Sequence, residues 1–335
     1  MQINLSTIAN NSICFRSNKQ ITTPEQKKLT NKVKPFLYLG ASVVPITMGI
    51  LGVKSGLKGL KLAINKVAAE LPKIDSLLPE EKTTLQKIIK EGLDPKLAEI
   101  FVKVKNIEDR AEFATEVYNS LFELLGYKAK PAFHILPKAP SDSTTGGWIN
   151  TSFSMQIYKD TTLKGSKAEI FDTIAHELEH FKQSAIILRT KTLGADALIE
   201  ATAKRFLKLD KENASLCLKR YGKPPAQITI TDINNYYNLD ADRENLKQFA
   251  EKLINEKGII EIDSEEGLLA KKYLVANQNY TNIDPTATEE TQHIQRLMYG
   301  DNLLEEKAFA EGHKHKKLYT NFILKLAEIR LFHKN

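Results

Sequence analysis

Cysteine is scarce in this chain of 335 residues, which contains only Cys14 and Cys217. Two cysteines in unrelated contexts argue against a disulfide framework and against a zinc site made of thiolates. No internal repeat of fixed period and no nucleic-acid-binding motif is present, and the Lys and Arg residues behind the net charge of +7 are interleaved with acids. We therefore expect no nucleic-acid partner. A hydrophobic content of 42% and a charged content of 27% are typical of a globular protein.

Histidine is also scarce, yet two of the seven histidines form the pattern H-E-x-x-H at residues 176–180. Positions four apart lie on the same face of an α-helix, so His176 and His180 can present two imidazoles to one metal ion. Glu177 lies beside them, where its carboxylate could hold a water molecule without binding the metal. At these residue frequencies the pattern arises by chance in roughly one chain in a hundred. The alternative is a solvent-facing helix on which these residues are ordinary surface groups.

The residues around the motif predict an amphipathic helix. Apolar residues recur at helical spacing, and the histidines lie off this stripe. Ser166 followed by Glu169 forms a capping box, which predicts that the helix begins near Lys167. Glu179 points away from both histidines, and we expect it to be solvated. The apolar stripe consists of Ile170, Ile174, Leu178, Phe181 and Ala185.

Two strands are predicted before this helix. Ala132–Leu136 reads as a short strand, and residues 148–158 alternate apolar with polar side chains over a longer one. In zinc peptidases an edge strand in that position pairs with an extended substrate. An ordinary sheet strand without a substrate role is an equally good interpretation. After the motif helix, the asparagine-rich segment 271–288 predicts a loop.

A catalytic zinc ion takes three protein ligands, so the two histidines need a third. The residues after His180 lack the glycine and histidine of a metzincin, which leaves a glutamate on a later helix. Glu305 begins the pattern E-x-x-A, and the small Ala308 would let its helix approach the motif helix closely. Glu200 begins a second E-x-x-A pattern and is the alternative third ligand, while Glu306 is the alternative in the neighbouring register. We prefer Glu305, because it follows a loop that could deliver it.

H-E-x-x-H followed far downstream by E-x-x-A resembles the gluzincin class of zinc metallopeptidases, over residues 130–185 and 295–315. The resemblance implies a zincin-like α+β fold, predominantly helical, with a small sheet whose edge strand precedes the motif helix. It implies a peptide or protein substrate, Zn²⁺ as cofactor and Glu177 as the general base. The implied metal ligands are His176, His180 and Glu305.

Other residues of the C-terminal region allow further interpretations. His313 and His315 lie among lysines, and we expect them to be exposed. Tyr299 or one of these histidines is a weaker candidate for stabilising an oxyanion. A rival to the enzyme is a membrane-anchored, catalytically inactive scaffold or partner-binding protein with a zincin-like fold. A second rival is a wholly helical protein in which the motif is accidental.

Composition divides the chain into four regions. Residues 1–34 are polar and predict a disordered tail. Residues 35–53 carry no charge and are long enough to cross a bilayer as one anchor helix, although Pro45 would kink it. A buried core helix is the alternative. Residues 54–125 predict a helical region and 126–335 a zincin-like metallopeptidase domain. We therefore expect a membrane-associated protein with a single N-terminal anchor; the flanking positive charges nearly balance and leave its orientation and the oligomeric state open.

Overall fold

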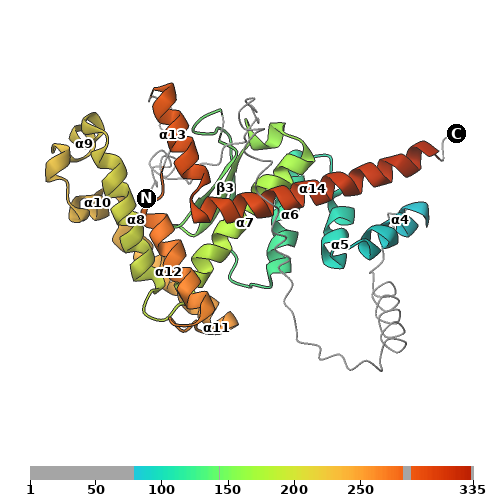
Figure 1. Ribbon diagram of the computed structural model, residues 1–335, viewed down its shortest axis with the longest axis horizontal. Coiled ribbons are helices and arrows are strands. Elements are labelled where there is room, and N and C mark those ends of the chain that lie inside the picture. Colours follow the sequence, from blue (N-terminus) through green and yellow to red (C-terminus); the bar gives the residue numbers. More distant parts are fainter. Residues whose placement is uncertain (1–78, 143, 282–287, 333–335) are drawn as a thin grey trace, which may run out of the picture.

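The computed structural model describes residues 79–142, 144–281 and 288–332, and these are mostly helical with one three-stranded sheet. This confirms the predicted α+β class. Figure 1 shows the red helix α14 crossing the green helix α7 near the middle of the molecule, with the sheet beside them. The predicted tail at 1–34, the predicted anchor at 35–53 and residues 54–78 lie outside the described residues.

The first described part consists of three helices. The α5 and α6 helices begin at the N-caps Asp94 and Asp109, whose carboxylates accept hydrogen bonds from backbone N–H groups of the first turn. Gly126 ends α6 in the left-handed conformation with a φ of 70°, which glycine adopts without strain. The bounds are α4 (Pro79–Lys90), α5 (Pro95–Val104) and α6 (Arg110–Leu125).

The sheet has the order β1-β3-β2, with β1 parallel and β2 antiparallel to β3. The prediction of one strand over 148–158 is wrong, because residues 150–153 form a turn and the chain doubles back. Phe153 adopts a φ of 48° in this turn. The antiparallel edge of the sheet is therefore β2, while β3 is central. The bounds are β1 (Ala132–Leu136), β2 (Gly146–Ile149) and β3 (Ser154–Tyr158).

The motif helix is α7, Lys167–Arg189, and it begins where the sequence predicts. Ser166 and Glu169 form the capping box: the Ser166 hydroxyl accepts from the Glu169 backbone N–H, and the Glu169 carboxylate accepts from that of Ser166. The predicted amphipathic pattern is wrong, because residues 170–181 are buried on every face. Helices α6, α8, α11, α12 and α14 and strand β2 all pack around α7.

Most of the remaining chain is helical. The predicted loop at 271–288 is wrong in its first half, because α12 continues to Gln278. Figure 1 shows α8, α9 and α10 as one lobe at the side opposite α4 and α5. The bounds are α8 (Gly194–Lys211), α9 (Ala214–Tyr221), α10 (Ile230–Tyr237), α11 (Leu239–Lys257), α12 (Glu265–Gln278), α13 (Glu289–Gly300) and α14 (Leu303–Phe332), with short 3₁₀ turns at Thr162–Lys164 and Pro225–Gln227.

An aromatic cluster fixes α14 against α7. The ring centroids of Phe171 on α7 and Tyr319 on α14 are 4.6 Å apart, and Phe101 and Phe113 contact Phe171 edge-on at 5.2 and 5.7 Å. Each such pair contributes about 0.5–1.5 kcal/mol beyond its buried area. The cluster therefore sets the crossing of the two helices that carry the predicted metal ligands.

No helix among the described residues is both long enough and apolar enough to cross a membrane.

Candidate metal centre

The two motif histidines lie side by side on α7. His176 and His180 are 0% and 2% exposed, and their Nε2 atoms are 3.1 Å apart. Two imidazole nitrogens at this distance, both turned toward one point, are the arrangement that the four-residue spacing predicts.

Helix α14 brings Glu305 to the same point. Its Oε2 lies 3.3 Å from His176 Nε2, its Oε1 lies 3.2 Å from His180 Nε2, and its side chain is fully buried. Ligand atoms about 2.0–2.1 Å from a tetrahedral metal ion lie about 3.3 Å from one another, so these separations fit one ion. Glu305 Oε2 has no contact of full hydrogen-bond geometry, and the His176 ring is the group that faces it. The buried group of His176, His180 and Glu305 could hold a metal ion.

The other candidate glutamates are elsewhere. Glu200 is exposed on α8 and forms an ion pair with Lys204, with Oε1 2.6 Å from Nζ. Glu306, the next residue on α14, is exposed. The structure therefore brings Glu305, and neither Glu200 nor Glu306, to the two histidines.

Small residues allow α14 to lie this close to α7. Ala308 is fully buried one turn after Glu305. Gly312 follows one turn later, where an added Cβ would lie 2.6 Å from Asp172 Oδ1 and 2.7 Å from the Asp172 carbonyl oxygen. A larger residue at position 312 would push the two helices apart, so the close approach requires glycine there.

Charges within the centre balance one another. Burial lowers the pKa of His176 to about 4, although Glu305 acts in the opposite direction. Burial also acts to lower the pKa of His180, but the carboxylates of Glu305 and Glu177 outweigh it and raise this pKa to about 9. Burial acts to raise the pKa of Glu305, yet the two histidines hold it well below its usual range. An ionised Glu305 therefore faces a site that favours positive charge.

Side chains outside the ligand group hold it in place. His180 Nδ1 lies 2.9 Å from Gln183 Oε1, and Gln183 Nε2 donates to the Leu304 carbonyl oxygen at 3.0 Å. The Tyr280 hydroxyl donates to Glu305 Oε1 at 2.7 Å. The Tyr299 ring packs edge-on against Tyr280, with the centroids 5.5 Å apart. Gln183 thus links the motif helix to the residue before Glu305, and Tyr280 orients the carboxylate.

Glu177 lies between the centre and strand β2. It is fully buried, and neither carboxylate oxygen has a hydrogen bond of normal geometry. Burial raises its pKa to about 8, while His180 and the Trp148 backbone N–H act to lower it. A Cβ at Gly146 of β2 would lie 2.7 Å from Thr173 Cγ2 and 3.0 Å from Glu177 Oε1. Glycine at position 146 therefore leaves room for this carboxylate.

Two predictions about nearby residues are wrong. Glu179 is buried, not solvated, and its carboxylate accepts a short hydrogen bond from Lys182. His315 is buried, with Nδ1 2.9 Å from the Glu311 carbonyl oxygen, and burial lowers its pKa. Both errors arise because helices enclose α7 on every side. His313 is exposed, as predicted.

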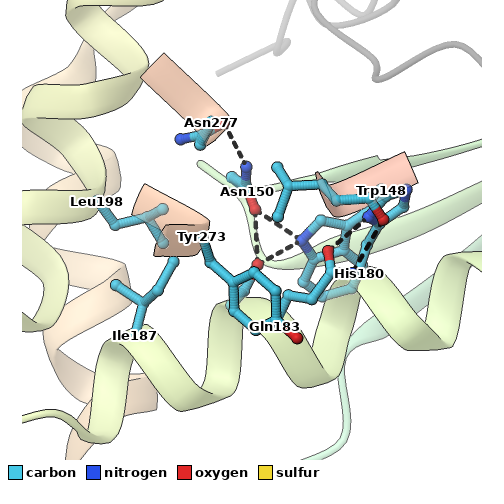
Figure 2. Close-up of a pocket in the computed structure, with 10 residues that line it drawn as sticks. Trp148, Asn150, His180, Gln183, Ile187, Leu198, Tyr273 and Asn277 are labelled. Carbon is cyan, nitrogen blue, oxygen red and sulfur yellow. Dashed lines mark hydrogen bonds between the residues drawn. The ribbon is translucent and has the colours of Figure 1, made fainter. Parts of the chain in front are cut away.

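A small cavity adjoins His180 (Figure 2), walled by strand β2, the turn after it and helices α7, α8, α12 and α14. Figure 2 shows the Asn150 side chain directed toward Trp148 and Asn277. Its Oδ1 accepts from Trp148 Nε1 at 2.8 Å and from Ser184 Oγ at 2.7 Å, and its Nδ2 donates to Asn277 Oδ1 at 3.3 Å. Amide and hydroxyl groups therefore line one side of the cavity.

Several residues of the centre are absent from the sequence predictions, namely Gln183, Tyr280, Asn277 and Gly312. Gln183 was detectable in principle, because it lies three residues after His180 on the same helix face. Tyr280 and Asn277 come from a segment predicted to be a loop. Gly312 stands in a lysine-rich stretch that reads as an exposed helix surface.

Comparison of the chain with protein-family models, with curated proteins and with solved structures found no match in any of the three. What the chain does is therefore inferred from the chemistry of the centre itself.

Proposed function

We propose that the protein is a zinc-dependent metallopeptidase of zincin-like fold. The observation that supports this most is the convergence of two histidine Nε2 atoms and the Glu305 carboxylate, with Glu177 beside them. Two histidines and one glutamate are a donor set of catalytic zinc sites, which leave a fourth position for water or substrate. The distances of 3.1–3.3 Å between these atoms fit such an ion.

Each residue of the centre has a distinct role in peptide hydrolysis. A zinc ion bound there supplies a Lewis acid that activates water and polarises the peptide carbonyl. Glu177 accepts a proton from the attacking water and delivers it to the nitrogen of the leaving amine. In the metal-free chain burial raises the pKa of Glu177 to about 8, and a cation bound beside it would act to lower this pKa toward neutral pH, which suits both steps. Tyr280 and Gln183 keep Glu305 and His180 in their orientations.

The sheet supports a peptide as the substrate. Strand β2 is the antiparallel edge strand of the described sheet, and a Cβ on its first residue, Gly146, would lie 3.0 Å from Glu177 Oε1. An extended peptide that adds to such an edge would place its backbone beside the centre.

Metal analysis tests the proposal first. We expect purified protein to contain zinc close to one ion per chain, and His176→Ala to lose it. Glu177→Gln should keep the zinc and lose cleavage of a peptide library, because Glu177 lies outside the ligand group. Absence of zinc from the wild-type protein would refute the metal site.

The burial of the centre favours a second candidate function. His176, Glu177 and Glu305 are all fully buried, and every residue of β2 is buried as well. A scaffold or partner-binding protein that keeps a structural metal ion would have such a closed centre. Stoichiometric zinc without cleavage of any peptide in the library would favour this candidate over the peptidase.

Membrane attachment through residues 35–53 is compatible with both candidate functions. It is proposed because this segment of the sequence carries no charged residue. We expect the full chain to remain with membranes after extraction at alkaline pH. Release of the full chain into the soluble fraction would contradict an anchor.

A further inference from the structure

The buried Arg205 on α8 is the residue whose position the proposed chemistry does not explain. It is 4% exposed. Within the described residues, its Nη1 donates to Asn277 Oδ1 at 3.2 Å, and its Nε has no hydrogen-bond partner. The guanidinium carbon lies over the rings of Phe206 and Tyr280, at 5.0 and 5.4 Å from the centroids.

No carboxylate among the described residues forms an ion pair with Arg205. Arg220, in the same helical lobe, shows the usual arrangement, because its Nη1 lies 2.8 Å from Asp210 Oδ1. Burial lowers the pKa of Arg205 to about 10, which still leaves it charged at pH 7. Two ring faces and one amide oxygen offset only part of the cost of burying a charge. The described structure therefore keeps a positive charge that lacks a matching anion.

Two sets of contacts connect this charge to the metal centre. Asn277, which accepts the Arg205 hydrogen bond, lines the cavity beside His180 (Figure 2). Tyr280, which lies under the guanidinium, donates its hydroxyl hydrogen bond to Glu305. Arg205 itself lies behind the cavity wall, so an anion in the cavity would reach it where the Asn277 side chain moves aside.

The edge of the Arg205 guanidinium formed by Nε and Nη2 indicates which anion would bind. The Nε and Nη2 groups of a guanidinium form a planar pair of donors that matches the two oxygens of a carboxylate. In Arg205 the one hydrogen bond within the described part of the chain uses Nη1, so this edge is the one left over. We propose, on the basis of the peptidase function above, that Arg205 binds a substrate carboxylate and selects peptides that carry one close to the bond that is cut.

The carboxylate can come from a peptide C-terminus or from an acidic side chain, and a binding experiment distinguishes them. The probe is a set of three fluorescent six-residue peptides: one with a free C-terminus, its C-terminal amide, and the same amide with glutamate as the last residue. Binding is measured to full-length, zinc-loaded Glu177→Gln protein, which keeps the ligands but does not turn over. We expect at least one carboxylate peptide to bind about tenfold more tightly than the neutral amide.

Substitution of Arg205 then tests its part. In the Glu177→Gln background, Arg205→Met should bring the ratio of affinities close to one, and Arg205→Lys should restore part of it. Arg220→Met is the matched control, because it removes a paired arginine away from the cavity, and it should leave the ratio unchanged. A ratio near one for both carboxylate peptides before substitution, or a ratio that Arg205→Met does not change, would overturn the proposal.

Thermal unfolding of the Arg205→Met chain gives an independent readout. Removing an unpaired buried charge should leave Tm unchanged or raise it, whereas a large decrease would show a structural role and count against the proposal. The peptidase proposal and the Arg205 proposal can be refuted independently of each other. Carboxylate binding through Arg205 without any cleavage by the wild-type protein would refute only the peptidase, and cleavage without a preference between acid and amide would refute only the role of Arg205.

Discussion

Gln183 connects the two halves of the centre through a single side chain. Its Oε1 accepts from His180 Nδ1, which leaves Nε2 as the nitrogen available to a metal, and its Nε2 donates to the Leu304 carbonyl next to Glu305. We expect Gln183→Leu to weaken zinc binding by about 10–100-fold, the usual cost of losing such a partner. Competition with a chromophoric chelator measures the affinity.

A second substitution at position 183 distinguishes the hydrogen bond that orients His180 from the packing of the Gln183 side chain. Gln183→Glu keeps an acceptor for His180, replaces the donor to Leu304 with an oxygen and adds a negative charge beside the centre, so its zinc affinity should fall less than that of Gln183→Leu. Equal affinities for wild type and Gln183→Leu would show that the hydrogen bond to His180 does not position the ligand.

Zinc binding should also depend on pH through His180. The raised pKa of about 9 means that the metal-free folded chain holds a proton on this ring at pH 7, and zinc must displace it. We expect the apparent zinc affinity to weaken by about tenfold for each pH unit from 8.5 to 6.5. Chelator competition at three pH values measures the slope, and an affinity independent of pH would contradict the assignment.

The same pKa fixes the sign of a stability effect in the metal-free chain. The folded-state pKa of His180 lies above its unfolded value of about 6.5, so its protonation stabilises the fold fully below about pH 6.5. This contribution to the free energy of unfolding is lost as the pH rises through about 9. Zinc-loaded protein should not lose stability over this range for that reason, because the ion takes the place of the proton.

Local pattern was enough to predict His176, His180 and Glu177, since their spacing alone puts them on one side of a helix. It favoured Glu305 over Glu200 through the loop before Glu305, and the four-residue pattern did not separate them, because both begin E-x-x-A and both lie on helices. Glu305 is buried against α7, whereas Glu200 faces solvent beside Lys204. That difference is set by how helices pack, and neither four-residue pattern contains it.

At the scale of elements, the crossing of α7 and α14 depends on Gly312. An alanine there would bring its Cβ to 2.6 Å from Asp172 Oδ1 and 2.7 Å from the backbone oxygen. We expect Gly312→Ala to destabilise the fold by about 1–3 kcal/mol, because the helices must separate. Zinc affinity should fall as well, since Glu305 lies on the same rigid helix. Urea unfolding and chelator competition measure the two effects.

Gly300, at the end of α13, is the control for this substitution. An added Cβ there meets nothing within 4 Å, so Gly300→Ala should leave both stability and zinc affinity close to wild type. A Gly312→Ala chain as stable as Gly300→Ala would mean that α14 can shift without cost.

Element boundaries were predictable where a local interaction sets them. The capping box at Ser166 fixed the start of α7 in the sequence and in the structure. The turn between β2 and β3 was hidden, because both strands are buried and their alternation continues through residues 150–153. Asn150 holds that turn through hydrogen bonds to Trp148 and Ser184, and the latter is distant in sequence.

At the scale of the whole molecule, the centre joins two parts of the chain that are far apart in sequence. Helix α7 follows the sheet, whereas α14 closes the described chain, and their ligands meet in the interior. The buried Glu305 carboxylate carries negative charge into a region with little water. A bound metal ion would compensate that charge, so metal binding and folding should be coupled.

Removal of the metal should therefore lower the stability of the entire fold. A ligand present at about a thousand times its Kd stabilises the folded state by about 4 kcal/mol, which corresponds to roughly 10 °C in Tm for a domain of this size. We expect a chelator to lower Tm by about this amount and added zinc to restore it. His180→Ala should unfold at the same temperature with and without chelator, since it lacks a complete ligand set. An unchanged Tm in wild-type protein shown to have lost its zinc would mean that α7 and α14 hold together by packing alone.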